Sequence, residues 1–179
     1  MRKITTFLAI ALAAVMVTSC VSMVDAQTRH KVRKMEYNSK YNYEVATLAV
    51  GVDGTKLVKV WGYGKKAEDA IRHAKELGVA CALFHGFPAG SNGSAAPTPA
   101  IIKSAAEPEA HQDYFDNFFA PGGQYLQYVN LSDNGPSSDR VKDKTTKMYK
   151  VGVVMSIAYD ELRKEMERQG IAKGLNSGF

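Results

Sequence analysis

Two apolar runs, residues 43–52 and 55–63, are separated only by the dipeptide Asp53-Gly54. Both runs are rich in valine, leucine and aromatic residues, which fit the half-buried surface of a β-sheet. Asp and Gly accept the positive φ values of a type I′ turn, so the pattern predicts a two-residue β-hairpin. This hairpin restricts the fold more than any other feature, because a lone hairpin is unstable and needs a larger sheet or a helix against it.

The hydrophobic period changes after Gly64. From Ala67 to Phe84 apolar residues recur at every third or fourth position, and charged residues take the opposite side. We therefore predict an amphipathic helix of about five turns. Alanine and glycine line its buried side, which would let the helix backbone lie close against a sheet.

Residues 86–107 are rich in glycine, proline, serine and alanine and show no hydrophobic period. A loop of this length is usually either functional or disordered, and we predict a flexible insert. Pro108 then suits the first turn of a helix. The aromatic residues at positions 114, 115, 118 and 119 share one face, so we expect a short aromatic helix that ends at residues 121–123.

The last part of the chain is expected to contain two strands and a helix. Residues 124–131 and 148–158 have strand-like patterns, and Asp160 could cap a helix that runs through Gln169 and ends at Gly170. The order β-β-α-loop-α-β-β-α predicts a single α+β domain, with a mainly antiparallel sheet of about four strands and helices packed on one face.

The start of the chain has the pattern of an export signal. A short positive stretch precedes an apolar core at residues 4–17, which is too short to span a bilayer. The core ends in Val-Thr-Ser-Cys at residues 17–20, which resembles the lipobox of bacterial lipoproteins. A rival cleavage site at residues 24–26 would instead release a soluble protein that begins at Gln27.

We predict a lipoprotein signal peptide at residues 1–19, a polar tether at 20–39, the α+β domain at 40–170 and a tail at 171–179. A lipid on Cys20 is the only bound group expected, because no cofactor motif is present. Residue 21 is Val rather than the Asp that retains many lipoproteins at the inner membrane. We therefore expect an outer-membrane lipoprotein that faces the periplasm.

Two resemblances extend this interpretation. The run Val-Lys-Val-Trp-Gly-Tyr-Gly at residues 58–64, followed by Ala67, Ala70 and Ala74, resembles the N-terminal domain of flagellar-assembly T proteins. That turn and helix, with the ending Lys-Gly-Leu-Asn-Ser-Gly-Phe at residues 173–179, also resemble uncharacterised lipoproteins of anaerobic Gram-negative bacteria. The first resemblance implies an accessory role in assembling an envelope structure, and the second implies no activity or cofactor.

Cys81 and His85 lie four residues apart, as a nucleophile and its base require on one helix face. The neighbours of Cys81 are alanine and leucine, which favour a buried core cysteine over a reactive one. If Cys20 carries a lipid, Cys81 has no partner for a disulfide within the chain. A Cys-dependent hydrolase is therefore only a remote alternative.

Two pairs of residues have the spacing of metal ligands on a helix: Asp69 with His73, and Glu107 with His111. A pair is too few, because structural zinc takes four protein ligands and catalytic zinc three. We predict no metal site. The cations are spread among acidic residues at a formal net charge of +5, so we also expect no nucleic-acid partner.

Four aromatic residues are candidates for recognition. Trp61 and Tyr63 share one face of a predicted strand, and Tyr125 and Tyr128 lie on another. They could fill the core, or they could form an exposed surface that receives a protein or stacks on sugar rings. The sequence favours a non-enzymatic lipoprotein that is an accessory or assembly component of a cell-envelope complex. The alternative is a periplasmic module that binds glycan or peptidoglycan.

Overall fold

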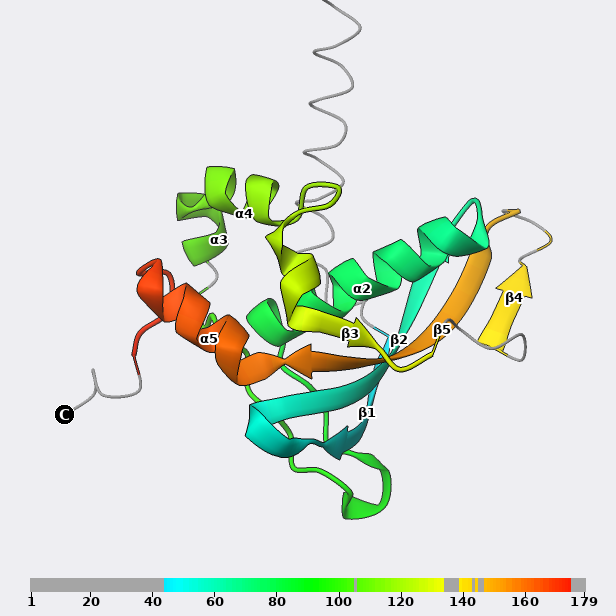
Figure 1. Cartoon of the computed structure of the whole chain (residues 1–179), viewed down its shortest axis with the longest axis horizontal. Coiled ribbons are helices and arrows are strands. Elements are labelled where there is room, and N and C mark those ends of the chain that lie inside the picture. The colour runs from blue at the N-terminus through cyan, green and yellow to red at the C-terminus, as the bar shows by residue number, and fades with distance from the viewer. Residues whose placement is uncertain (1–43, 105, 134–138, 143, 145–146, 175–179) are drawn as a thin grey trace, which may run out of the picture. The chain divides into compact units, whose positions relative to one another are not determined.

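The sheet is built on two long antiparallel strands, β2 (Thr55–Gly64) and β5 (Tyr149–Ala158), which pair along their full length. Strand β1 (Val45–Val50) pairs with the other edge of β2. The short strands β3 (Val129–Leu131) and β4 (Arg140–Lys142) share the second edge of β5. The predicted fold class is confirmed: this is a mixed α+β domain with a mainly antiparallel sheet (Figure 1).

This computed structural model describes residues 44–104, 106–133, 139–142, 144 and 147–174. The predicted signal peptide and the tether at 20–39, including Cys20, lie outside these residues. Within the described part, no helix is both long and apolar enough to cross a membrane.

The first hairpin has the predicted left-handed turn, but it is not the two-residue hairpin expected, because the last strand pair is Val50 with Lys56 and four residues separate β1 from β2. Asp53 has φ 55° and ψ 35°, and Gly54 has φ 69°, so both central residues lie in the left-handed region that a type I′ turn requires. The 3₁₀ turn η1 (Val52–Gly54) therefore separates the strands, and Gly51 N–H donates to the Thr55 carbonyl at 2.9 Å.

Helix α2 (Ala67–Phe84) has the predicted bounds and packs against β2 and β5. The close approach that its small residues suggested is present, because a Cβ added at Gly62 of β2 would lie 2.0 Å from the Ala70 carbonyl oxygen. The strand side chains that face it are fully buried and form the centre of the core: Val58, Val60, Val151, Val153, Met155 and Ile157.

The segment after α2, which the sequence predicts as a flexible insert at residues 86–107, makes several backbone hydrogen bonds. The N–H groups of Ile101 and Ile102 donate to the carbonyls of Ala82 and Leu83, at 3.1 and 2.8 Å, so the returning chain satisfies the end of α2. A further bridge joins Phe87 to Thr98, and η2 (Ser91–Gly93) lies between them. The largest apolar side chains of this segment are buried together with one alanine: Phe87, Ile101, Ile102 and Ala95.

The predicted aromatic helix is present in two pieces, α3 (Glu107–Ala110) and α4 (Gln112–Phe118), which a non-helical residue separates. The predicted strand at 124–131 was wrong in its first part, because Gln124–Tyr128 forms the 3₁₀ helix η3. The reason is that Tyr125 and Tyr128 lie three positions apart, which is one turn of a 3₁₀ helix. This spacing places Tyr125 against Phe119 and Tyr128 against Phe118, with ring centroids 5.6 and 6.0 Å apart, respectively.

Helix α5 (Tyr159–Arg168) follows β5 without a loop, so Asp160 lies inside its first turn and is not the predicted cap. Leu162 and Met166 point into the core, as expected, and both are fully buried. The helix stops at Gly170, whose φ of 71° suits the left-handed position after a helix. The described part of the predicted tail is partly packed, because Ile171 and Ala172 are buried.

Candidate functional site

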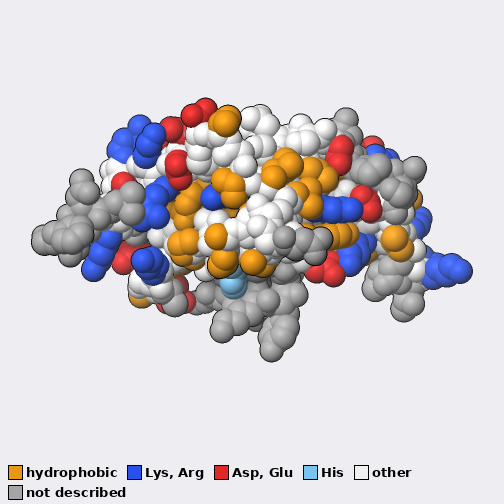
Figure 2. Space-filling model, turned by 90° about the horizontal axis from the view of Figure 1, so that it is seen from below, with side chains coloured by type: hydrophobic (Ala, Val, Ile, Leu, Met, Phe, Trp, Pro, Cys, Tyr) orange, Lys and Arg blue, Asp and Glu red, His pale blue; other side chains and the backbone are white. Residues whose placement is uncertain are grey.

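One face of the sheet points away from α2, and we call it the open face. The alternation of β2 and β5 brings eight paired residues to it: Leu57, Lys59, Trp61 and Tyr63 from β2, and Lys150, Gly152, Val154 and Ser156 from β5. Apart from Gly152, these residues are at least partly exposed, whereas the central residues of both strands on the α2 face are buried. Figure 2 shows one face of the domain, where apolar side chains gather in the middle with charged side chains around them.

Trp61 lies at the centre of the open face. Its cross-strand partner is Gly152, and a Cβ at that glycine would come within 3.0 Å of Trp61 Nε1, so the indole occupies the space of the missing side chain. Lys59 Nζ lies 5.2 Å and Lys150 Nζ 5.9 Å from the centre of the Trp61 ring, within the range of cation–π contacts. The indole is therefore held in place by contacts within the domain.

A hydrogen-bonded network continues from Trp61 toward the edge of the sheet. The Tyr63 hydroxyl donates to Glu44 at 2.6 Å, and Lys150 Nζ donates to the same carboxylate at 2.8 Å. The bonds from Lys150 and Tyr63 lower the pKa of Glu44, and burial followed by the bond to Glu44 raises the pKa of Tyr63. The same bond to Glu44 raises the pKa of Lys150.

Two more contacts fix this face. Lys59 forms an ion pair with Asp139 at 2.7 Å, so both lysines beside Trp61 have an acidic partner. The backbone N–H of Tyr63 donates to His73 Nδ1 at 3.1 Å, which ties β2 to α2. His73, which has metal-ligand spacing with Asp69, is partly buried and accepts this bond.

The four candidate aromatic residues do not form one surface. Trp61 and Tyr63 share the open face, and the Tyr63 side chain is partly exposed. Tyr125 is 1% exposed and belongs to the core beside Phe119. Tyr128 is half-buried and stacks on Phe118. The open face therefore contains two of the four.

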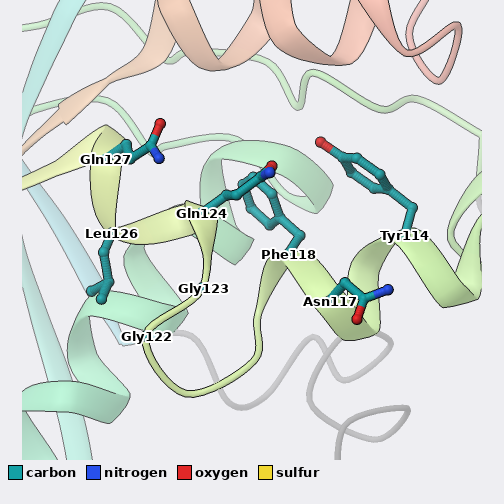
Figure 3. Close-up of a pocket in the computed structure, with 8 residues that line it drawn as sticks. All are labelled: Tyr114, Asn117, Phe118, Gly122, Gly123, Gln124, Leu126 and Gln127. Atoms are coloured by element: carbon teal, nitrogen blue, oxygen red, sulfur yellow. The ribbon is translucent and has the colours of Figure 1, made fainter.

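A hollow of about 450 Å³ lies between α4 and η3 (Figure 3), and no pattern in the sequence predicted it. Its lining combines aromatic rings, side-chain amides and a glycine turn: Tyr114, Asn117, Phe118, Gly122, Gly123, Gln124, Leu126 and Gln127. The rings of Tyr114 and Phe118 stack at 5.7 Å. The sequence has side-chain amides on both sides of Gly122-Gly123. They line one hollow only because of the turn that joins α4 to η3, which the sequence did not predict.

Cys81 is buried and its thiol donates to the Gly86 carbonyl at 3.0 Å. Burial raises the pKa of this thiol to about 12, so it stays protonated at neutral pH. These properties are those of a core cysteine, which the sequence favoured over a nucleophile assisted by His85.

The two pairs with metal-ligand spacing take part in ordinary polar contacts. His111 Nε2 lies 3.5 Å from a carboxylate oxygen of Glu107, four residues earlier. Asp69 instead forms an ion pair with Arg72 at 3.2 Å. The described residues contain no group of three or more His, Cys, Asp or Glu side chains that could hold a metal ion.

Comparisons with family models, with curated proteins and with solved structures find no match to this chain. The resemblances at residues 58–74 and 173–179 thus stay predictions. The open face and the hollow are the two candidate binding surfaces described in this domain.

Proposed function

We propose that this protein is a non-enzymatic bacterial lipoprotein and an accessory or assembly component of a cell-envelope complex. In this proposal the chain is exported, a lipid on Cys20 anchors it to the outer membrane, and the domain faces the periplasm. A partner protein of the complex binds the open face around Trp61.

The arrangement of Trp61 and Gly152 is the observation that supports this proposal. Tryptophan and tyrosine are enriched among the residues that contribute most to protein–protein affinity. An indole already fixed by Gly152 and by two lysines loses little conformational freedom on binding. The lysines are matched by Asp139 and Glu44, so a partner with a largely apolar, uncharged contact suits the centre of this face.

Affinity capture of the lipidated protein from detergent-solubilised membranes tests the proposal. We expect wild-type protein to recover a partner in stoichiometric amount, and Trp61→Ala to recover less than a tenth of it. Removing an interface hot spot costs about 2 kcal/mol or more, which is more than a tenfold change in affinity. Lys164→Ala is the matched control, because Lys164 lies exposed on α5. A folded Trp61→Ala protein that captures as much partner as wild type would contradict the proposal.

A photoreactive amino acid at position 63 gives a second readout that does not depend on affinity. Tyr63 lies on the open face beside Trp61, so a partner bound there should form a covalent adduct of defined mass. The same group at position 164 should give none. Adducts from position 164 and none from position 63 would place the interface elsewhere.

A further inference from the structure

The hollow between α4 and η3 has the size and lining of a ligand site. Its volume of about 450 Å³ falls within the range usual for small-molecule pockets. The turn at Gly122 leaves room, because a Cβ added at that glycine would meet nothing within 4 Å. Gly123 packs closely instead, since its added Cβ would lie 2.4 Å from the Phe118 carbonyl oxygen. The hollow thus has a fixed wall on one side and open space on the other.

The Tyr114 hydroxyl is the first feature that indicates a ligand. Its hydroxyl oxygen is buried but has no hydrogen-bond partner in the described structure. Burial raises the pKa of this phenol to about 12, so the group stays a neutral donor and acceptor at physiological pH. A buried polar group without a partner costs free energy, which a ligand hydroxyl that reached this oxygen would recover.

The side-chain amides that line the hollow are the second feature that indicates a ligand. Figure 3 shows the Tyr114 hydroxyl and the Gln124 amide pointing toward each other, with Gln127 and Asn117 also on the rim. Each amide offers both a donor and an acceptor, as a sugar hydroxyl does. None of the lining residues is charged, so the hollow lacks the cations that a phosphate or a carboxylate would need.

The aromatic rings complete the set. Tyr114 stacks on Phe118, and Phe118 on Tyr128, so the hollow has rigid rings beside its amides. Aromatic surface next to neutral groups that both donate and accept hydrogen bonds matches a sugar ring, which is apolar on its faces and carries hydroxyls at its rim. A purely apolar ligand would leave the Tyr114 hydroxyl and the amides of Gln124 and Gln127 without partners, whereas Asn117 already donates to the Asp113 carbonyl at 2.9 Å.

We propose that the hollow between α4 and η3 binds a neutral saccharide unit, with Tyr114, Gln124 and Gln127 as the residues that bond to its hydroxyls. This site contains none of the open-face residues. It therefore goes beyond the proposed docking function and uses a different part of the molecule.

Calorimetric titration of the purified mature protein tests the site, with three neutral disaccharides as probes: cellobiose, maltose and N,N′-diacetylchitobiose. We expect saturable binding of at least one. Tyr114→Phe should weaken that binding about 3- to 10-fold, the value of one hydrogen bond. Gln124→Leu should weaken it by a similar factor. Tyr63→Phe, which removes a hydroxyl from the open face, should leave the affinity unchanged.

Stability separates a binding role of Tyr114 from a structural one. Since its hydroxyl has no partner in the free protein, Tyr114→Phe should not lower the midpoint of thermal unfolding without sugar. With sugar at saturation, wild type should gain more stability than the variant. No binding of any probe by wild type would overturn the proposal, and so would equal affinities of wild type, Tyr114→Phe and Gln124→Leu.

The two proposals fail independently. Trp61→Ala should lose the partner protein and keep the sugar, while Tyr114→Phe should keep the partner and bind sugar more weakly. A Trp61→Ala protein that no longer binds sugar, although it is folded, would contradict the placement of the saccharide in the hollow.

Discussion

Trp61 lies across Gly152 of the neighbouring strand, where a Cβ would come within 3.0 Å of the indole nitrogen. The glycine therefore makes room for the tryptophan, and its absence of a side chain determines where the indole rests. Lys59 also lies above this glycine, because its Cε would be 3.0 Å from the same Cβ. One small residue thus positions both the ring and one of its cations.

Gly152→Val should displace the indole without unfolding the domain. Valine is favoured in strands, so we expect the free energy of unfolding to change by about 1 kcal/mol or less. Tryptophan fluorescence should shift, and capture of the partner should fall at least tenfold. Lys164→Ala, at an exposed position on α5, is the control and should leave both unchanged. Unaltered partner capture by a folded Gly152→Val protein would show that the position of Trp61 is unimportant.

Gly62→Ala should destabilise the fold strongly. The new methyl group would lie 2.0 Å from the Ala70 carbonyl and 2.5 Å from the Ala74 amide nitrogen, so α2 would have to move away from β2. Overpacking of this kind costs about 1–3 kcal/mol. We expect the upper end of this range, because the methyl group would meet backbone atoms of α2, which cannot turn aside as a flexible side chain can. Chemical denaturation measures it. Gly174→Ala, where an added Cβ meets nothing within 4 Å, should change stability by less than about 0.5 kcal/mol.

Cys81 should resist thiol reagents in the folded protein. The thiolate is the reactive form, and burial raises the pKa of Cys81 to about 12, so almost no thiolate exists near pH 7. Mass mapping should find Cys81 modified in denaturant and unmodified without it. Rapid labelling of the native protein would revive the hydrolase alternative.

The same cysteine should make the fold less stable at alkaline pH. The thiol has an unfolded pKa of about 8.5 and a higher folded one, so only the unfolded chain loses its proton between these values. The stabilisation is complete below pH 8.5 and falls as pH rises toward 12. Urea denaturation between pH 7 and 10 should therefore show a steeper decline for wild type than for Cys81→Ala. Equal slopes would contradict a raised pKa.

The sequence predicted those elements whose pattern is local. Asp53-Gly54 specifies its turn through backbone preference alone, and the period from Ala67 to Phe84 specifies α2. The path of residues 86–104 was not predictable, because it depends on bonds from Ile101 and Ile102 to carbonyls at the end of α2. Strand β4 was missed for a similar reason, since three exposed residues become a strand only by pairing with β5.

The candidate sites follow the same division. Alternation along β2 correctly placed Trp61 and Tyr63 on one face. The pairing of Trp61 with Gly152 depends on the register between β2 and β5, which are far apart in the sequence. The hollow depends on the turn between α4 and η3, and residues 124–128 had been predicted as strand. A strand would have sent Tyr125 and Gln127 to one face and Gln124 to the other.

Glu44→Gln should loosen Tyr63 at a small cost in stability. The Glu44 and Lys150 side chains are 47% and 36% exposed, so solvent screens their ion pair and we expect a loss of about 0.5 kcal/mol. Because the folded pKa of Glu44 is lowered, its contribution is present above the ordinary value of 4.5 and is lost as pH falls below it. Urea denaturation should thus separate wild type from Glu44→Gln at pH 7 and bring them together near pH 3. A difference that grows on acidification would have the wrong sign.

Cys20→Ser should release the protein from the membrane. A single acyl chain binds only marginally at about 0.8 kcal/mol for each buried methylene, so stable anchoring needs the several chains that a lipoprotein cysteine carries. We expect wild type in the membrane fraction and Cys20→Ser in the soluble fraction. Cys81→Ser is the control, since Cys81 is buried in the domain and should not affect membrane association. Mass spectrometry of the mature N-terminus decides between the two cleavage sites, because a lipidated Cys20 supports the anchor and an unmodified Gln27 would remove it while leaving export intact.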